Sequence, residues 1–423
     1  MQGDGLEGNY PWLWPMDMGL RTGAAALDAF GSMLAASTDR QPQQEPKWTT
    51  PHEIVLDTPM LRVRLFGHGG GPPAIIVTPY ALHGPVMADL APGHSLIERL
   101  LDEGLDHLAL VEWKSAGPQT QYLGIDDYLL RLSAALDDIG RPSTLIGLCQ
   151  GGWLSLMLAA RFPEKVSKLV LAGAPVDLDA APSAIVAAAR GADPEFIKTL
   201  IQANAGFMRG RTLMSAWSAR GLKEPGAADI LQNDDASEEL VARFRIWHAW
   251  TLDLPGSYYL QVFEDLFRRN KLARGEFQAL GRPVDLSNIR APLFLIASAQ
   301  DEVTPAEQLM AVQRLVGTRR SQISTALARG SHLSLFMGAR TLETVWREAA
   351  RWVHKMDGDF LSNDSSAGRQ RAADCSALVR ATADLNEYLV FASLGRSTIQ
   401  NMRLVRELDL LEASLSGAPQ DQV

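Results

Sequence analysis

The stretch STLIGLCQGGW, residues 143–153, decides the fold that the sequence predicts. Its first half is a short apolar strand and its second half opens a helix, so that Cys149 lies in the turn between them. Glycines stand two positions before and two positions after the cysteine, at Gly147 and Gly151. This pattern is the cysteine form of the nucleophile elbow, a very tight turn that strains the nucleophile and leaves no room for bulk at those two positions. The sequence therefore predicts a reactive thiol at the end of a strand.

The alternative role for Cys149 is that of a small buried hydrophobe, as free cysteines often are. The strand-to-helix position favours catalysis, because it places the sulfur at a helix N-terminus, where the dipole favours a thiolate. The other cysteine, Cys375, follows a polar stretch and has no comparable surroundings. Two cysteines are too few for a disulfide scaffold or a cysteine-based zinc cluster, so a reducing, cytoplasmic setting fits best.

Strands and helices alternate on both sides of the elbow, and the apolar strands are unbroken, which predicts an α/β fold with a mostly parallel sheet covered by helices on both faces. The alternation stops near Pro175 and resumes at Pro292, with a helical pattern and no clear strand between them. We therefore predict a helical cap inserted into one α/β core, rather than two or three separate domains. The predicted segments are a helical or irregular extension (1–58), the first core segment (59–175), the cap (176–288), the second core segment (289–356), a linker (357–371) and a helical tail (372–423).

An elbow nucleophile needs an acid and then a histidine further along the chain. Asp301 follows the strand that begins near Leu293, and His332 follows the next strand. His332 would deprotonate the thiol, while Asp301 would fix the tautomer of the imidazole and stabilise its protonated form. Glu302 and Asp177 are competing acids, and Asp301 itself could serve only as the cap of the helix near Pro305.

The oxyanion hole would be formed by the backbone N–H of Gln150 and by a second one from the loop that follows the strand near Val77. Tyr80 and Ala81 are the candidates in that loop, and His83 is the other notable residue there. The sequence contains no H-E-x-x-H, no C-x-x-C and no phosphate-binding glycine motif. We therefore expect neither a metal nor a cofactor.

The chain has 423 residues and a net charge of −9. Without a basic excess, nucleic acid is an unfavourable partner. Acidic residues precede the first basic residue, Arg21, and no apolar run approaches the length of a membrane span, so we expect no signal peptide and no transmembrane segment.

Residues from about 60 to 355 resemble the polyhydroxyalkanoate synthases and the intracellular polyhydroxyalkanoate depolymerases, which have an α/β-hydrolase fold with a cysteine nucleophile. By this resemblance the family's Cys, Asp and His fall on Cys149, Asp301 and His332. The synthases' Trp shortly after the Asp is absent, and the segment from Ser331 to Gly338 is closer to the depolymerase pattern. The segments that carry the resemblance are Gly147–Gly152, Leu90–Ile97, Glu112–Ser115, Tyr258–Leu260, Asn270–Leu272 and Gly281–Leu286.

The leading hypothesis is therefore a Cys-His-Asp hydrolase that cleaves the ester bonds of polyhydroxyalkanoate polyesters or oligoesters through a thioester acyl-enzyme. The alternative is a synthase-like acyltransferase that uses a hydroxyacyl-CoA thioester. A third hypothesis is a non-catalytic protein that docks on a polyester granule through its aromatic N-terminus or its helical tail, although ordinary packing explains those aromatic residues better. A second copy of the chain, forming a homodimer, is a further partner that the tail could take.

Overall fold

The computed structural model describes residues 44–67, 69–140, 142–219 and 237–361. The helix expected at residues 23–36, the tail with Cys375 and most of the predicted linker lie outside the described residues. The linker prediction differs from the structure at its start, because helix α15 (Arg347–Leu361) continues through the first five residues of that segment. Val353, Met356 and Phe360 keep helical spacing in the sequence, which agrees with this longer helix.

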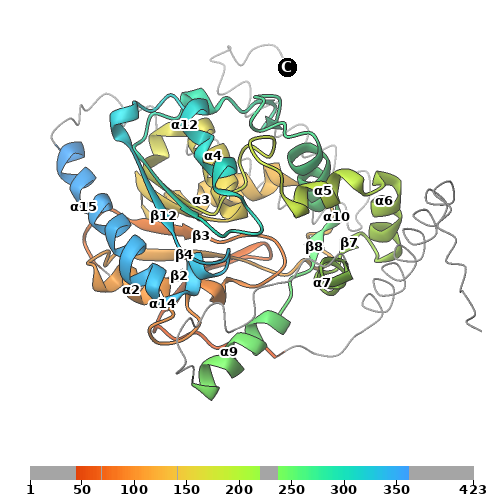
Figure 1. Cartoon of the computed structure of the whole chain (residues 1–423), viewed down its shortest axis with the longest axis horizontal. Helices are drawn as coiled ribbons and strands as arrows, with labels where there is room; N and C mark the ends of the chain where they lie inside the picture. Colours follow the sequence, from red (N-terminus) through yellow and green to blue (C-terminus); the bar gives the residue numbers. More distant parts are fainter. Residues whose placement is uncertain (1–43, 68, 141, 220–236, 362–423) are drawn as a thin grey trace, which may run out of the picture. The chain divides into compact units, whose positions relative to one another are not determined.

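An eight-stranded mixed sheet forms the core and confirms the predicted α/β-hydrolase fold class (Figure 1). Strand β2 pairs antiparallel with β1 and β4, and the remaining neighbours are parallel. In spatial order the strands are β1 (Glu53–Asp57), β2 (Leu61–Leu65), β4 (Leu108–Trp113), β3 (Ala74–Val77), β5 (Ser143–Leu148), β6 (Val166–Ala172), β11 (Leu293–Ser298) and β12 (Ile323–Ala328).

The sequence does not predict the first strand of the sheet, because residues 1–58 are expected to form an irregular or helical extension. In the structure β1 lies at the sheet edge and pairs only with β2. Its residues Ile54 and Val55 are adjacent apolar residues, and each is 46% exposed. An edge strand with little burial lacks the alternating pattern by which a half-buried strand is recognised.

Helices cover both faces of the sheet, as the period-2 alternation of the strands requires. In β3, Ile75 and Val77 belong to the hydrophobic cluster under α3, α4 and α11, whereas Ile76 belongs to the cluster under α2 and α15. Figure 1 shows α3 and α4 on one side of the strands and α2 and α15 on the other. The bounds are α2 (Leu96–Asp102), α3 (Ile125–Ile139), α4 (Gln150–Arg161), α11 (Ala306–Met310), α12 (Val312–Leu315), α13 (Ser334–Met337) and α14 (Ala339–Thr341).

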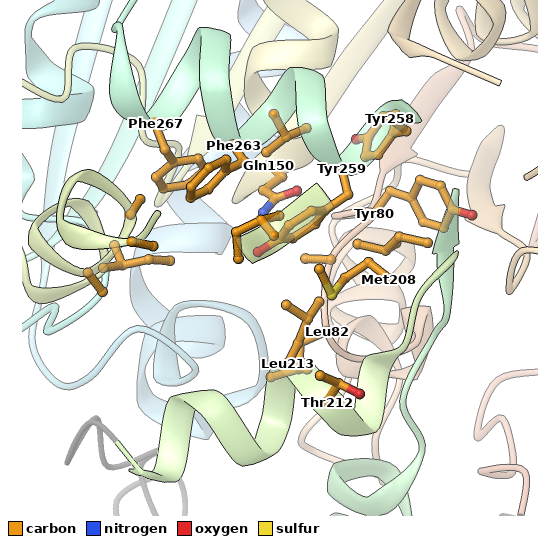
Figure 2. Close-up of a pocket in the computed structure, with 18 of the residues that line it drawn as sticks. Tyr80, Leu82, Gln150, Met208, Thr212, Leu213, Tyr258, Tyr259, Phe263 and Phe267 are labelled. Carbon is orange, nitrogen blue, oxygen red and sulfur yellow. The ribbon is translucent and has the colours of Figure 1, made fainter. Parts of the chain in front are cut away.

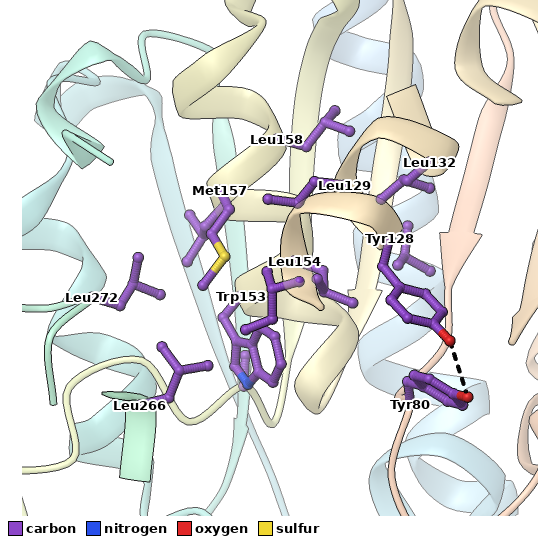
Figure 3. Packing of buried hydrophobic residues seen from close by; sticks show 14 of the residues in the cluster. Tyr80, Tyr128, Leu129, Leu132, Trp153, Leu154, Met157, Leu158, Leu266 and Leu272 are labelled. Carbon is purple, nitrogen blue, oxygen red and sulfur yellow. Dashed lines mark hydrogen bonds between the residues drawn. The ribbon is translucent and has the colours of Figure 1, made fainter. Parts of the chain in front are cut away.

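Helix α4 is deeply buried where it follows the elbow. Trp153 is 1% exposed and Leu154 and Met157 are fully buried, and they pack against α3 (Figure 3). Figure 3 also shows the hydrogen bond from the Tyr128 hydroxyl to the Tyr80 hydroxyl, 3.3 Å long, on the side of the cluster nearest β3. This packing fixes the start of α4, and with it the turn that holds Cys149.

The inserted segment between β6 and β11 is mostly helical, as predicted, but it also contains two short antiparallel strand pairings, β7 with β8 and β9 with β10. Each of these strands has two residues, too few to give a periodic signal in the sequence. The elements of the inserted segment are α5 (Ala184–Gly191), α6 (Pro194–Ala203), β7 (Phe207–Met208), α7 (Gly210–Ala219), α9 (Glu238–Ala249), β8 (Leu254–Pro255), α10 (Gly256–Gln261), a π-helical stretch η4 (Val262–Arg268), β9 (Gln278–Ala279) and β10 (Arg282–Pro283).

Candidate active site

Cys149 lies between β5 and α4, in the tight turn that the sequence predicts. Its backbone has φ 49° and ψ −119°, a conformation that is strained for a residue with a side chain. The turn is held by two hydrogen bonds, from the Cys149 N–H to the Ala172 carbonyl (2.8 Å) and from the Gly152 N–H to the Cys149 carbonyl (2.9 Å). The neighbouring strand and the helix therefore both constrain the position of the sulfur.

The glycines on either side of Cys149 are required by close backbone contacts. A Cβ atom at Gly147 would lie 2.5 Å from the Gly152 Cα, and one at Gly151 would lie 2.0 Å from the Val77 carbonyl oxygen. Both distances are far below any van der Waals contact. The elbow thus requires residues without a side chain at these two positions, because Gly151 packs against the backbone of β3 and Gly147 packs against the helix that follows Cys149.

We expect Gly151→Ala to destabilise the protein by about 3–5 kcal/mol, because the new methyl group must displace the β3 backbone. That backbone has little freedom, since β3 is hydrogen-bonded to β4 and β5 on its two sides. Thermal unfolding followed by circular dichroism measures the effect. Gly191→Ala is the matched control: no heavy atom would lie within 4 Å of its Cβ, so an unchanged midpoint is expected there. Equal midpoints for wild type and Gly151→Ala would contradict the steric account.

The structure brings Asp301 and His332 together, and His332 lines the same pocket as Cys149. The Nδ1 atom of His332 lies 2.7 Å from Oδ2 of Asp301. The other carboxylate oxygen of Asp301, Oδ1, accepts hydrogen bonds from the N–H groups of Val303 (2.9 Å) and Thr304 (2.7 Å). Asp301 therefore orders its own loop and contacts the imidazole at the same time.

His332 is 5% exposed, and its electrostatic surroundings favour a bound proton. Burial alone would lower the pKa of His332, but the charges of Asp301 and Cys149 and their hydrogen bonds outweigh burial and hold that pKa well above its ordinary value. The imidazole thus contacts a carboxylate on one side and lines the pocket that holds the sulfur on the other. This position suits a group that gives and takes a proton in that pocket.

The two competing acids occupy other positions. Glu302 accepts a hydrogen bond from the backbone N–H of His332 (3.2 Å) and does not contact the ring in any interaction that we find among the described residues. Asp177 is paired with Arg314 and accepts a hydrogen bond from the amide of Asn270 (2.8 Å). Asp301 is consequently the carboxylate that the structure joins to the imidazole.

The three candidate oxyanion donors have different surroundings. Gln150 is the first residue of α4, and both Gln150 and Ala81 line a pocket that also contains Cys149 and His332. Tyr80 is 1% exposed, and its hydroxyl donates to the Lys114 carbonyl (3.0 Å), so its side chain belongs to the core. These side-chain contacts do not decide between the backbone N–H groups of Tyr80 and Ala81, so Gln150, Tyr80 and Ala81 all stay candidate donors.

We call the cavity around the sulfur the thiol pocket. The sequence does not predict most of its walls, which come from several segments of the chain. Val303 and Leu333 are sequence neighbours of Asp301 and His332 and could have been found on that basis, whereas Ile185 and Trp247 lie in the inserted segment, away from any motif. The lining residues are Pro79, Ala81, Leu82, His83, Met87, Cys149, Gln150, Ile185, Trp247, Glu302, Val303, His332 and Leu333.

A second, larger cavity, the apolar pocket, adjoins the thiol pocket (Figure 2). It encloses about 1040 Å³, part of it open to solvent, and its walls come from α5, α6, α7, α10, η4 and the loop after β3. Figure 2 shows Tyr259, Phe263 and Phe267 among the apolar side chains that surround it. Four residues line both cavities: Ala81, Leu82, Gln150 and Ile185. The Cys149 sulfur thus lies in a pocket that adjoins an extended apolar space.

Two features are absent from the described residues. In residues 44–67, 69–140, 142–219 and 237–361, no group of three or more His, Cys, Asp or Glu side chains could hold a metal ion. No helix within these same ranges is long and apolar enough to span a bilayer.

Comparison with known proteins finds similarity to a depolymerase family model and to polymerase subunits. A family model described as "PHB de-polymerase C-terminus" matches residues 173–357. The chain is 27% identical over 368 residues to a poly(3-hydroxyalkanoate) polymerase subunit of Haloferax mediterranei, with 81% of this chain and 72% of that protein covered. It is 32% identical over 253 residues to the corresponding subunit of Synechocystis, with 56% and 66% covered. It is 28% identical over 300 residues to the corresponding subunit of Allochromatium vinosum, with 67% of this chain and 81% of that protein covered.

Among solved structures, the monoacylglycerol lipase of Paleococcus ferrophilus is similar at 16% identity and a TM-score of 0.47, with 70% of this chain and 99% of that chain covered.

Proposed function

Because the chain belongs to the polyhydroxyalkanoate synthase family of α/β-hydrolase-fold proteins, we propose that it is an acyltransferase that extends a polyester chain from hydroxyacyl-CoA thioesters. The sequence motifs alone favour hydrolysis first and acyl transfer second. The similar proteins are named as polymerase subunits, and this supports the opposite order. The proposed catalytic residues are Cys149, His332 and Asp301.

In the first proposed step, the Cys149 thiolate attacks the thioester carbonyl carbon. The backbone N–H of Gln150 and one from the loop at Tyr80 and Ala81 hold the developing oxyanion. The C–S bond to CoA then breaks, and His332 gives its proton to the departing CoA sulfur. The products are free CoA and an acyl group joined to Cys149 through a new thioester.

In the second proposed step, the terminal hydroxyl of a growing chain attacks the Cys149 thioester. The negative charge on the sulfur is one of the causes that hold the pKa of His332 high, and acylation has removed that charge. The imidazole has also given up its proton, so it can act as the base that deprotonates the hydroxyl. The new ester forms, and the Cys149 thiolate departs beside the imidazolium.

The observation that carries this proposal is the apolar wall around the sulfur. Leu82, Ile185 and Trp247 line the thiol pocket, and the apolar pocket continues from it. Such walls hold an aliphatic chain close to the thioester and disfavour water, which would otherwise compete with the chain-end hydroxyl. The apolar pocket also contains two deeply buried hydroxyls without a protein partner among the described residues, those of Thr212 and Tyr258, which suit the oxygen atoms of a polyester.

Hydrolysis is the second candidate function. It is supported by the depolymerase family model that matches residues 173–357 and by the sequence that follows His332. In that segment Phe336 packs edge-on against the imidazole, with ring centroids 5.2 Å apart. The mechanism would be the same except that water takes the acyl group in the second step.

Two incubations of the purified full chain distinguish these functions. With 3-hydroxybutyryl-CoA we expect release of CoA together with insoluble polymer that grows with time. With amorphous polyhydroxybutyrate we expect little soluble hydroxyacid. Release of hydroxyacid from the polymer, without polymer growth from the thioester, would reject acyl transfer in favour of hydrolysis.

Two further expectations accompany the proposed function. We propose that the inserted segment acts as a cap over the thiol pocket, because Ile185 and Trp247 contribute to the walls of that pocket. Docking on a polyester granule in the cytoplasm would depend on the extensions, which lie outside the described residues.

A further inference from the structure

The side chain of Gln150 lies where the two cavities meet, since it lines both the thiol pocket and the apolar pocket. Figure 2 shows its amide among the aliphatic and aromatic side chains of the apolar pocket. The carbonyl oxygen of this amide, Oε1, is buried, and no protein group among the described residues donates a hydrogen bond to it. A polar acceptor therefore stands without such a partner on the residue that follows Cys149 and lines the same pocket.

A buried acceptor without a partner is unfavourable, because it has given up its hydrogen bonds to water without compensation. A methionine at position 150 would have a similar volume and would keep the backbone N–H that the oxyanion hole uses. The amide thus has a cost that neither packing nor the elbow explains. A ligand that brings a hydroxyl or N–H donor to Oε1 would offset this cost.

The position of Gln150 limits what that donor can be. Its neighbours in the thiol pocket already have partners: His332 is bonded to Asp301, and Glu302 accepts from the His332 N–H. The thioester and ester groups themselves have no donor, and the amide N–H groups of the CoA arm leave with CoA when Cys149 is acylated. A 3-hydroxyacyl unit adds one donor, a hydroxyl two carbons from the carbonyl carbon that Cys149 would attack.

We infer that Oε1 of Gln150 accepts a hydrogen bond from the 3-hydroxyl of the acyl unit held at Cys149, so that the protein selects hydroxyacyl donors over unsubstituted acyl donors. The inference rests on the proposed function for the identity of the acyl unit. Gln150 is then a specificity-determining residue through its side chain, separately from any role of its backbone N–H. A site that pairs with a substrate hydroxyl discriminates strongly against the analogue that lacks it, because the acceptor would stay unpaired.

The test compares two 4-nitrophenyl esters, of 3-hydroxybutyrate and of butyrate, whose acyl groups differ only in the hydroxyl. The rate of nitrophenol release reports acylation of the enzyme and does not depend on whether a chain end or water accepts the acyl group. For wild type we expect a clear preference for the hydroxy ester. For Gln150→Met we expect this preference to fall by about 10-fold to 100-fold, mainly through slower reaction of the hydroxy ester.

Gln308→Met is the matched control. Gln308 is also a buried glutamine whose Oε1 has no hydrogen-bond partner among the described residues, but it lines neither cavity. The Gln308→Met variant should show the same preference between the two esters as wild type, even if the substitution lowers its melting temperature. Circular dichroism confirms that each variant is folded before its rates are compared.

Four results would each overturn the inference. Wild type could react equally fast with the two esters or release nitrophenol from neither. The preference could stay unchanged in Gln150→Met, or it could fall by the same factor in Gln308→Met. Failure of the proposed acyl transfer gives a different result, in which no polymer forms from hydroxyacyl-CoA while the ester preference and its dependence on Gln150 persist.

Discussion

Replacing Cys149 by alanine is expected to reduce acyl transfer or ester hydrolysis by about 10⁴-fold or more, to the limit of detection. Both proposed reactions pass through a thioester on this sulfur, and no other described group near His332 can form one. The fold should tolerate the change, because alanine keeps the Cβ atom and requires the same backbone conformation at φ 49°. The measurement is CoA release from 3-hydroxybutyryl-CoA, with the melting temperature as a check on folding.

Cys375→Ala is the control for Cys149→Ala, since it removes the other cysteine of the chain. It should retain wild-type turnover. Intact-protein mass spectrometry adds a second readout: an acyl adduct should appear on wild type and on Cys375→Ala but not on Cys149→Ala. Turnover that survives in Cys149→Ala would rule out the proposed nucleophile, whichever molecule accepts the acyl group.

The elbow was predictable because its requirements are local. Gly147 and Gly151 are small for reasons that lie within a few residues of Cys149 and in one contact with β3. Asp301 and His332 were predictable for a related reason: each follows a strand, and the carboxyl ends of parallel strands meet at one edge of the sheet. A carboxylate and an imidazole placed at the ends of β11 and β12 therefore come together without any need to know the loops in detail.

The walls of the pockets could not be predicted in this way. Ile185 and Trp247 reach the thiol pocket from α5 and α9, and their positions depend on how the inserted segment packs. Nothing in the periodicity of a helix states which cavity its side chains will line. The unpartnered oxygen of Gln150 is a similar case, because a glutamine after the nucleophile gives no sign in the sequence of whether its amide is satisfied.

The same limit explains why the sequence motifs favour hydrolysis over acyl transfer. Both reactions use the same nucleophile, base and acid, so the motifs do not separate them. The choice depends on whether water or a chain-end hydroxyl reaches the proposed Cys149 thioester. We propose that the apolar walls and the inserted segment control this access. The sequence differences from the synthases that follow Asp301 and His332 bear on that choice only indirectly.

Asp301→Asn is expected to lower turnover by about 10³-fold to 10⁴-fold while leaving Cys149 in place. The Oδ1 atom of Asp301 accepts two backbone N–H groups and Oδ2 faces Nδ1 of His332, so both sides of the carboxylate are acceptors. An asparagine must turn its NH₂ either toward the N–H groups of Val303 and Thr304, which repel it, or toward Nδ1. In the second case Nδ1 must accept, and the imidazole takes the tautomer that cannot receive a proton at the nitrogen facing the sulfur.

The pH profile of Asp301→Asn supplies a readout that simple loss of stability would not change. Asp301 contributes to holding the pKa of His332 well above its ordinary value, so the imidazolium of the wild type persists to higher pH than it would without that charge. Without the carboxylate charge that pKa falls, and the alkaline limb of the residual activity should move to lower pH. Asp177→Asn is the control, because it alters the other acid that follows a strand without touching the imidazole. An Asp301→Asn profile with the wild-type alkaline limb would show that the Asp301 charge does not control the proton on His332.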